Sequence, residues 1–374
     1  MENRKMKLLF LTNVPSPYRV DFFNALGLQC ELTVLYQKES SSERDRKWTA
    51  EAAKTFRQVY LKGSSTAVDK AFCPGVIRWL HSGWDAIVIC GNTSPTEMLA
   101  IEWCRLRRLP YCIEADGAFA KSGRGLKERL KTHFIGGAGL YLSTCQQLDQ
   151  YFCRYGADGE RIVRYHFSSL RASDILAEPV TEAEKTALRQ QLDIREKQML
   201  LSVGQFIPRK GFDVLLEAVN GMDKNIGIYI VGGKPTEEYL RYARENDLTN
   251  VHFVGFQTRD ELKTYYMAAD AFVLPTREDI WGLVVNEAMA YGQPVVTTDR
   301  CTAGLELLTS GENGYVVPVE DSHALAGAIA AMLENSRALG ANALETIRAY
   351  TVEAMAGDHI TLLERFCSGR ASVE

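Results

Sequence analysis

The sequence lacks long apolar runs, paired cysteines and an excess of positive charge, and each absence excludes a class of protein. No stretch approaches the roughly 18 consecutive apolar residues that a membrane-spanning helix requires, and the first apolar run, which ends at Thr12, is too short for a signal peptide. The nine cysteines include no C-x-x-C pair and no histidine at zinc spacing, which favours reduced thiols. A formal net charge of −4 gives no basis for binding duplex nucleic acid. We therefore expect a cytoplasmic protein with no nucleic-acid partner.

Several catalytic signatures are also missing. The chain contains no G-x-S-x-G nucleophile motif, no H-E-x-x-H metal motif and no Walker phosphate loop. Its six histidines are scattered along the sequence, which is more typical of structural or exposed residues than of a catalytic group. The function must be inferred from other motifs.

The composition is that of an ordinary globular chain, with 46% hydrophobic and 24% charged residues over a length of 374 that indicates two domains. The charge is divided unevenly between the two halves. Residues 1–170 hold 24 Lys and Arg against 17 Asp and Glu, a net of +7, whereas the remainder has a net of −11. This asymmetry predicts that the halves face different partners.

Strands and helices alternate in both halves, which predicts an α/β fold built from two doubly wound parallel sheets. In the first half Pro17 follows Ser16, which can cap a helix over 18–26, and further helices are expected at 95–107 and 125–135. In the second half Thr258 and Glu261 form a capping box. The domain junction is expected near 168–180. The expected strands are 7–12, 31–36, 85–90, 110–113, 139–144, 198–203, 226–231, 250–254, 270–274, 294–298 and 314–317.

Two loops that follow strands of the second half carry glycine and basic residues. In such sheets ligands bind beyond the carboxyl ends of the strands. Gly204 lets a backbone approach a ligand closely, and Arg209 and Lys210 near a helix N-terminus can neutralise a diphosphate. A solvated basic turn explains the same residues equally well. The loop with Gly233 and Lys234 invites the same two interpretations.

A third loop, over 275–290, carries two acidic residues on either side of Gly282, where a helix begins. A carboxylate can accept hydrogen bonds from two adjacent hydroxyls, which is how proteins bind ribose. Glu287 inside the helix suits a ribose, and Asp279 in the loop suits the hydroxyls of a second sugar. The apolar neighbours of Glu287, which are Val284, Val285, Ala288 and Met289, argue against a solvated helix face.

At these motifs the sequence resembles the retaining GT-B glycosyltransferases of family 4, the glycosyl transferases group 1. The resemblance is strong over about 198–320, through VGQFIPRKG, REDIWGLVVNEAMAYGQPVVTT and GENGYVVP. It is looser in the first half, through FLTNVPSPYRVDFFNAL and EADG. It implies a GT-B fold with two Rossmann-like domains facing across a cleft. The implied domains are an acceptor-binding 1–172, to which a C-terminal helix over 353–374 returns, and a donor-binding 173–352.

The resemblance also implies a site. Glu287 resembles the ribose-binding glutamate of the family's E-x7-E signature, and Lys210 resembles its diphosphate lysine. With the residues above it gives a donor-binding set of Gly204, Gln205, Arg209, Lys210, Gly233, Asp279, Gly282, Leu283, Val284 and Glu287.

Three positions depart from the family pattern. The first glutamate of the signature is Asp279, which is one methylene shorter, and the usual diphosphate arginine is the neutral Gln205. Arg209 is the candidate to supply that charge. Where the family often has a histidine after a strand of its first domain, this chain has Glu114 and Asp116. We expect one of them to contact the donor sugar or the acceptor hydroxyl; a Mg²⁺ site is the alternative use of the pair.

The expected function is transfer of a sugar, with retention of configuration, from a UDP-sugar to a glycan or lipid-linked glycan in bacterial polysaccharide assembly. The leaving diphosphate takes the acceptor proton in this family, so positioning and charge stabilisation suffice. We expect Asp116, Glu114, Asp279 and Lys210 to serve catalysis and no metal or cofactor to be required, since cations and a helix end can neutralise the diphosphate. The alternatives are a catalytically silent nucleotide-sugar-binding partner of another transferase and a nucleotide-sugar epimerase.

The first half contributes the expected acceptor site and a candidate membrane surface. Loops after its strands offer Ser16, Tyr18, Arg19, Asn92 and Thr93 to an acceptor. The segment 121–134 carries five basic residues and one acidic residue, with Leu126, Leu130 and Phe134 on one helical face. Such a helix can lie on an anionic inner leaflet or pack its apolar face on its own domain, and the sequence leaves both open.

Overall fold

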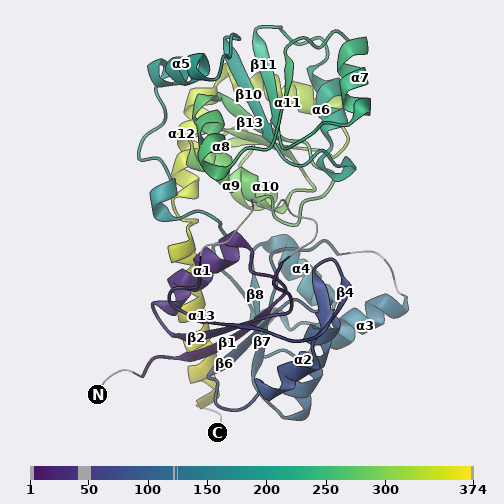
Figure 1. The fold of residues 1–374 in the computed structure, drawn as a ribbon, viewed down its shortest axis with the longest axis vertical. Helices are drawn as coiled ribbons and strands as arrows, with labels where there is room; N and C mark the ends of the chain where they lie inside the picture. Colours follow the sequence, from purple (N-terminus) through teal and green to yellow (C-terminus); the bar gives the residue numbers. More distant parts are fainter. Residues whose placement is uncertain (1–3, 41–51, 121–122, 124, 372–374) are drawn as a thin grey trace. The chain divides into compact units, whose positions relative to one another are not determined.

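The computed structural model describes residues 4–40, 52–120, 123 and 125–371. The chain divides into two compact units, each with its own parallel sheet (Figure 1). Unit 1 contains Met1–Ser169 and Thr351–Glu374, and unit 2 contains Leu170–Tyr350. Within the described residues, no helix combines the length and apolar character needed to cross a bilayer.

The seven-stranded sheet of unit 1 has the order β3-β2-β1-β6-β7-β8-β9, and every neighbouring pair is parallel. A short antiparallel hairpin, β4 (Ser64–Ala67) and β5 (Lys70–Phe72), stands apart from it. The strands of the large sheet are β1 (Lys7–Thr12), β2 (Glu31–Tyr36), β3 (Arg57–Tyr60), β6 (Ala86–Cys90), β7 (Tyr111–Glu114), β8 (Leu140–Ser143) and β9 (Ile162–Arg164).

The helices of unit 1 include α13 (Val352–Ala371), which comes from the end of the chain and packs beside α1 (Figure 1). The central strands are fully buried, because the sheet is covered by helices and its residues are almost all apolar. The other helices are α1 (Pro17–Gly27), α2 (Pro95–Leu106), α3 (Leu126–Ile135) and α4 (Gln146–Arg154), with 3₁₀ turns at Pro74–Arg78 and Gly159–Arg161.

The six-stranded parallel sheet of unit 2 has the order β12-β11-β10-β13-β14-β15. Its strands are β10 (Gln198–Val203), β11 (Ile226–Val231), β12 (Val251–Val254), β13 (Ala271–Leu274), β14 (Val295–Thr298) and β15 (Gly314–Val317). Its helices are α5 (Glu182–Gln191), α6 (Phe212–Val219), α7 (Glu237–Glu245), α8 (Arg259–Ala268), α9 (Leu283–Ala290), α10 (Thr302–Leu307), α11 (Ser322–Glu334) and α12 (Ser336–Ile347), with 3₁₀ turns at Ala172–Asp174 and Pro208–Lys210.

The strand order reverses once in each sheet, between β1 and β6 and between β10 and β13. Loops that leave the carboxyl ends of such a pair diverge to opposite faces of the sheet, which makes the edge a ligand-binding position. Most of the residues selected from the sequence lie after these four strands. The exceptions are Glu114 and Asp116 at the end of β7 and Gly233 after β11.

The eleven expected strands are confirmed to within one residue at each end, whereas β3, β9 and the hairpin were not anticipated. The capping box of Thr258 and Glu261 is confirmed at the start of α8. The expected cap at Ser16 is wrong in one respect. Ser16 occupies the N-cap position of α1, but its side chain makes no capping hydrogen bond.

Candidate functional site

In unit 2, the loops after β10 and β13 are joined at the carboxyl edge of the sheet. The carbonyl of Arg209 accepts hydrogen bonds from the Arg277 amide at 2.8 Å and from the Thr276 hydroxyl at 3.0 Å. Gly211 has a φ of +67°, and a Cβ built on it would lie 2.1 Å from the carbonyl oxygen of Pro275. Glycine is therefore required here for the two loops to meet.

The joined loops bring three of the expected donor residues together. Lys210 Nζ lies 2.6 Å from Asp279 Oδ2, and Arg209 Nη1 lies 3.6 Å from Asp279 Oδ1. Arg209 Nη1 also donates to the carbonyl of Glu278 at 2.7 Å. The Lys210 and Asp279 side chains are mostly buried, whereas the Arg209 side chain is exposed. Two cations thus share one carboxylate, and the group retains a surplus positive charge beside the loop.

Glu287 lies on α9, and its partner is a residue that the sequence analysis did not select. Tyr266 of α8 donates its hydroxyl to Glu287 Oε2 at 2.9 Å. Burial raises the pKa of Glu287, against the lowering effects of the Tyr266 hydrogen bond and the positive charge of Arg259. The pattern of apolar residues around Glu287 indicated this burial, but no local pattern connects it to a residue 21 positions earlier.

The remaining donor candidates lie in the loops after β10, β11 and β13 and at the start of α9. Gly204 and Gln205 follow β10, and the Gln205 side chain is exposed. Gly233 follows β11 with a φ of +119°. Gly282 is the N-cap residue of α9 with a φ of +103°. The helix then begins with Leu283 and Val284, both half-buried.

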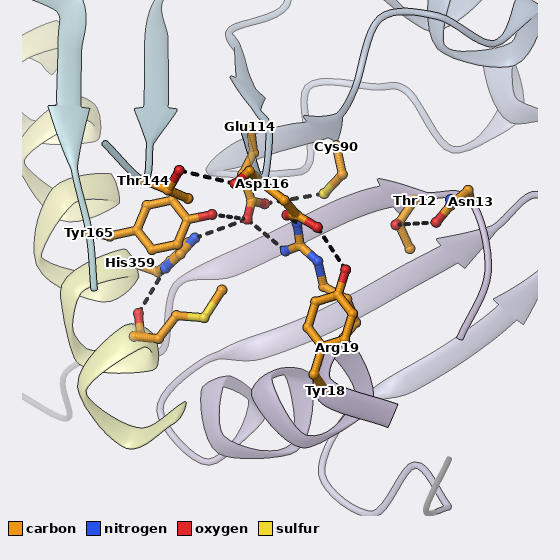
Figure 2. Close-up of polar contacts among 11 residues, drawn as sticks. Thr12, Asn13, Tyr18, Arg19, Cys90, Glu114, Asp116, Thr144, Tyr165 and His359 are labelled. Carbon is orange, nitrogen blue, oxygen red and sulfur yellow. Dashed lines mark hydrogen bonds and ion pairs between the residues drawn. The ribbon is translucent and has the colours of Figure 1, made fainter. Parts of the chain in front are cut away.

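In unit 1, Arg19 of α1 lies between the two carboxylates that follow β7 (Figure 2). Its Nη1 donates to Glu114 Oε1 at 2.6 Å, and its Nη2 donates to Asp116 Oδ1. Tyr18 donates its hydroxyl to Asp116 Oδ2 at 2.7 Å. The structure thus brings together four of the expected catalytic and acceptor residues, two from α1 and two from the end of β7.

Glu114 is the buried centre of this group, with an exposed fraction of 0%. It accepts hydrogen bonds from the Tyr165 hydroxyl at 2.9 Å and from Cys90 Sγ at 3.2 Å (Figure 2). Burial alone would raise the pKa of Glu114, but the adjacent Arg19 guanidinium and His359 outweigh it and hold that pKa well below its usual range. Without exposed surface Glu114 supports its neighbours, whereas the Asp116 side chain is 22% exposed.

His359 connects this group to the last helix of the chain. Its Nε2 lies 3.7 Å from Glu114 Oε1, and its Nδ1 lies 2.8 Å from the Met355 carbonyl (Figure 2). Because a carbonyl only accepts hydrogen bonds, Nδ1 carries a proton. On the same helix Asp358 accepts from the His166 amide at 2.9 Å. The sequence analysis did not single out these residues, because more than 190 positions separate them from their partners.

Ser16, Asn92 and Thr93 lie in the loops after β1 and β6. Ser16 is buried. The Asn92–Thr93 loop is held by Glu97, whose carboxylate accepts from the Thr93 amide at 2.7 Å. These three residues are near the edge of the sheet where the acceptor loops were expected.

The helix α3 exposes part of the apolar face identified in 121–134. Leu126 is 75% exposed and Leu130 is 46% exposed, whereas Phe134 is half-buried. Lys121, Ser122 and Arg124 lie outside the described residues. The two leucines therefore do not pack their side chains against their own domain.

The part of the chain that the structure describes contains no group of three or more His, Cys, Asp or Glu side chains suited to a metal ion.

Comparison with known proteins identifies similar sequences and a similar fold. Residues 184–349 match the family model of the glycosyl transferases group 1. A phosphatidyl-myo-inositol mannosyltransferase of Mycobacterium leprae is 35% identical over 176 residues, 45% of this chain and 46% of that one. An amylovoran biosynthesis glycosyltransferase of Erwinia amylovora is 33% identical over 157 residues, 39% of this chain and 38% of that one. The chain thus spans less than half the length of these curated relatives.

The fold is shared along the whole chain. The Anabaena protein HepE, solved in complex with UDP, superposes with a TM-score of 0.75 at 18% identity, covering 98% of this chain and 100% of that one. Residues 184–349 are therefore similar to the glycosyl transferases group 1, and the fold of the chain is GT-B.

Proposed function

We propose that the protein is a retaining glycosyltransferase that transfers a sugar from a nucleoside diphosphate sugar to a glycan or lipid-linked glycan. The observation that carries the proposal is the convergence of Arg209, Lys210 and Asp279 at the carboxyl edge where the strand order of unit 2 reverses. Such an edge is where sheets of this kind bind phosphorylated ligands.

The donor is bound by groups of different chemistry. Lys210 and Arg209 bind the diphosphate, since charge-assisted hydrogen bonds to phosphate are the strongest that these side chains make. Asp279, released from Lys210 as the phosphate takes its place, accepts from the hydroxyls of the transferred sugar. Glu287 accepts from the ribose. The backbone near Gly204, Gly233, Gly282, Leu283 and Val284 allows close approach of the ligand.

UDP is the nucleotide that we propose. The complex of HepE with UDP supports it, because that protein shares the fold along its whole length. Because Gln205 is neutral, Arg209 is the second cation, beside Lys210, that can bind the diphosphate.

Unit 1 provides the acceptor side of the reaction. Tyr18, Arg19, Glu114 and Asp116 form one hydrogen-bonded group, in which Asp116 is the exposed carboxylate. We assign to Asp116 a hydrogen bond with the acceptor or donor-sugar hydroxyl. Glu114 and Arg19 hold Asp116 in place. Tyr18 keeps its proton, because burial and the negative charge of Asp116 raise its pKa, and therefore acts as a donor. Ser16, Asn92 and Thr93 offer further polar contacts to an acceptor.

The chemistry requires no protein nucleophile. The bond between the anomeric carbon and the diphosphate oxygen breaks, and the acceptor oxygen forms its bond on the same face of the sugar. The acceptor proton passes to the leaving phosphate. Lys210 and Arg209 stabilise the charge that develops on that phosphate, which is why we propose a reaction independent of metal ions.

We propose that the reaction serves polysaccharide assembly and takes place at a membrane surface. The amylovoran biosynthesis relative supports the first part of this proposal. The exposed Leu126 and Leu130 beside Lys127 and Arg129 support the second, since an apolar face flanked by cations suits an anionic leaflet.

The test is nucleotide release from a panel of UDP-, GDP- and ADP-sugars with glycan and glycolipid acceptors, with and without chelator. We expect acceptor-dependent release of UDP that survives the chelator and is abolished by Glu287→Ala. Binding of UDP without any release would favour the silent partner instead. Conversion of the sugar without an acceptor would favour the epimerase.

A further inference from the structure

We propose that Tyr266 is a positioning residue that holds the carboxylate of Glu287 ready for the two hydroxyls of a nucleotide's ribose. The inference rests on the donor site proposed above and adds to it a residue that acts through Glu287. It comes from a contact between two helices of unit 2 that no motif in the sequence connects.

The contact uses one of the two carboxylate oxygens. The Tyr266 hydroxyl donates to Glu287 Oε2 at 2.9 Å. Glu287 Oε1 makes no hydrogen bond with any residue that the structure describes. An ionised carboxylate has about four acceptor positions. One donor therefore fixes the plane of the carboxylate and leaves enough positions for two ribose hydroxyls.

Tyr266 can orient Glu287 because its own ring is fixed. The side chain is only 2% exposed, and its ring stacks on Tyr291 at 5.3 Å between centroids with an angle of 11° between planes. Phe272 packs on it at 5.9 Å. The Tyr266 carbonyl accepts a hydrogen bond from the Gln293 side chain, which lies beyond the end of α9. A group held in this way loses little entropy when a ligand binds.

The Tyr266 hydroxyl has a second role, because its hydrogen bond lowers the pKa of Glu287 and so favours the ionised carboxylate. Burial raises the pKa of Glu287 and the negative charge of Asp174 adds to this effect, whereas the Tyr266 hydrogen bond and the positive charge of Arg259 oppose it. Arg259 is itself paired with Asp174 at 2.5 Å, and Tyr291 is a further titratable group beside this carboxylate. Loss of the hydroxyl therefore favours the protonated carboxyl, which accepts hydrogen bonds from sugar hydroxyls less well.

The experiment compares two ligands that differ in one ribose hydroxyl. The first is the diphosphate, among UDP, GDP and ADP, that binds the wild-type chain most tightly; the second is its 2′-deoxy counterpart. Calorimetry measures the Kd of both for the wild type and for Tyr266→Phe, which removes only the hydroxyl and keeps the stacked ring. Tyr265→Phe is the matched control, because Tyr265 lies on the same helix and its hydroxyl makes no hydrogen bond with Glu287 or with another described residue.

We expect Tyr266→Phe to weaken binding of the ribose ligand roughly five- to twentyfold, the loss of one hydrogen bond to a charged group. Binding of the 2′-deoxy ligand should change much less, on the order of twofold, and Tyr265→Phe should change neither by more than that. In a Glu287→Gln background the same tyrosine substitution should have no further effect. Equal weakening of both ligands would overturn the proposal, because it would indicate a general disturbance of the site.

The pH dependence provides a readout that a merely structural role would not move. The ratio of the two Kd values cancels the titration of the diphosphate, which both ligands share. In the wild type this ratio should fall towards one as the pH falls through the pKa of Glu287, and in Tyr266→Phe the fall should begin at a higher pH. An unshifted profile would overturn the proposal.

Three further outcomes are decisive. If Tyr266→Phe does not fold, Tyr291→Leu tests the same idea by removing the stacked ring and keeping the hydroxyl, and it too must weaken the ribose ligand selectively. If none of the three diphosphates binds the wild type, the donor site itself is wrong and the role of Tyr266 fails with it. If the ligands bind and Tyr266→Phe has no effect, the donor site stands and only the present inference fails.

Discussion

Arg19 and Glu114 form a buried ion pair at 2.6 Å that joins the first helix of unit 1 to the end of strand β7. The two side chains are 5% and 0% exposed, so neither is solvated by bulk water. Breaking such a pair is more costly than removing it, since the remaining charge is buried without a partner.

Arg19→Met should therefore destabilise the chain by about 3–5 kcal/mol, because the buried Glu114 would lose its main partner. The free energy of unfolding is measured by denaturant titration. Arg4→Met is the control, because Arg4 pairs with Asp85 at 3.2 Å on the surface and should cost less than about 1 kcal/mol. Equal effects of the two substitutions would contradict the role given to Arg19.

Glu114 and Glu287 should change the pH dependence of stability in opposite directions. The folded-state pKa of Glu114 is lowered, so its stabilisation is present above the unfolded pKa of about 4.3 and is lost as the pH falls through the folded pKa. The folded-state pKa of Glu287 is raised, so its favourable contribution is present below the unfolded pKa and is lost as the pH rises through the folded pKa.

Denaturation of Glu114→Gln and Glu287→Gln between pH 3 and pH 8 checks this prediction. Glu114→Gln should lose less stability than the wild type on acidification below about pH 4.3. Glu287→Gln should lose less than the wild type as the pH rises above that value. Parallel curves for both variants and the wild type would show that neither carboxyl titrates as the structure indicates.

The sequence predicted the elements and the edge of the sheet, but not the contacts made there. Apolar runs located β10 and β13, because most of their residues are buried on both faces of the sheet. The glycines and the basic pair Arg209–Lys210 located a loop. The pairing of Lys210 with Asp279, however, depends on two loops 69 residues apart that meet only because β10 and β13 are neighbours.

Contacts between segments far apart in the sequence also explain which residues and strands the sequence analysis missed. β3 has exposed and half-buried residues instead of an apolar run, since it lies at the edge of its sheet. His359 resembled any scattered histidine in the sequence, and only the return of α13 to unit 1 places it beside Glu114. Either Glu114 or Asp116 was expected to contact a sugar, because nothing in the EADG motif indicates which of the two carboxylates is buried.

Gly211→Ala should separate the two donor loops. A Cβ at Gly211 would lie 2.1 Å from the Pro275 carbonyl oxygen, and the backbone has a positive φ of +67°. Gly221→Ala is the matched control, since Gly221 has a φ of +87° with nothing within 4 Å of the added atom. The control should cost about 1–2 kcal/mol of stability for its backbone alone, and Gly211→Ala should cost more and weaken UDP binding. Equal cost at the two positions would mean that the loops tolerate the clash.

Gln205→Arg should strengthen UDP binding, and Arg209→Gln should weaken it, if Arg209 supplies the charge that position 205 lacks. One charge-assisted contact corresponds to roughly a tenfold change in Kd or more. The informative variant is the double substitution, in which an arginine at 205 should recover most of the affinity lost at 209. Calorimetry with UDP measures all three. A double variant as weak as Arg209→Gln alone would show that the two positions do not serve the same phosphate.

Binding to an anionic bilayer should depend on the exposed leucines of α3. Leu126 is 75% exposed and the neighbouring Lys127 and Arg129 are exposed as well, so insertion of the leucine and attraction of the cations act together. We expect the wild-type chain to float with vesicles of anionic lipid at low salt and to be released by high salt. The substitutions Leu126→Ser and Leu130→Ser together should abolish flotation.

Leu28→Ser is the control, because Leu28 is 67% exposed in the same unit but follows α1 instead of a basic helix. Flotation that is lost equally in the control would assign the effect to general surface hydrophobicity, and flotation that survives in the α3 variant would exclude this helix as the membrane surface.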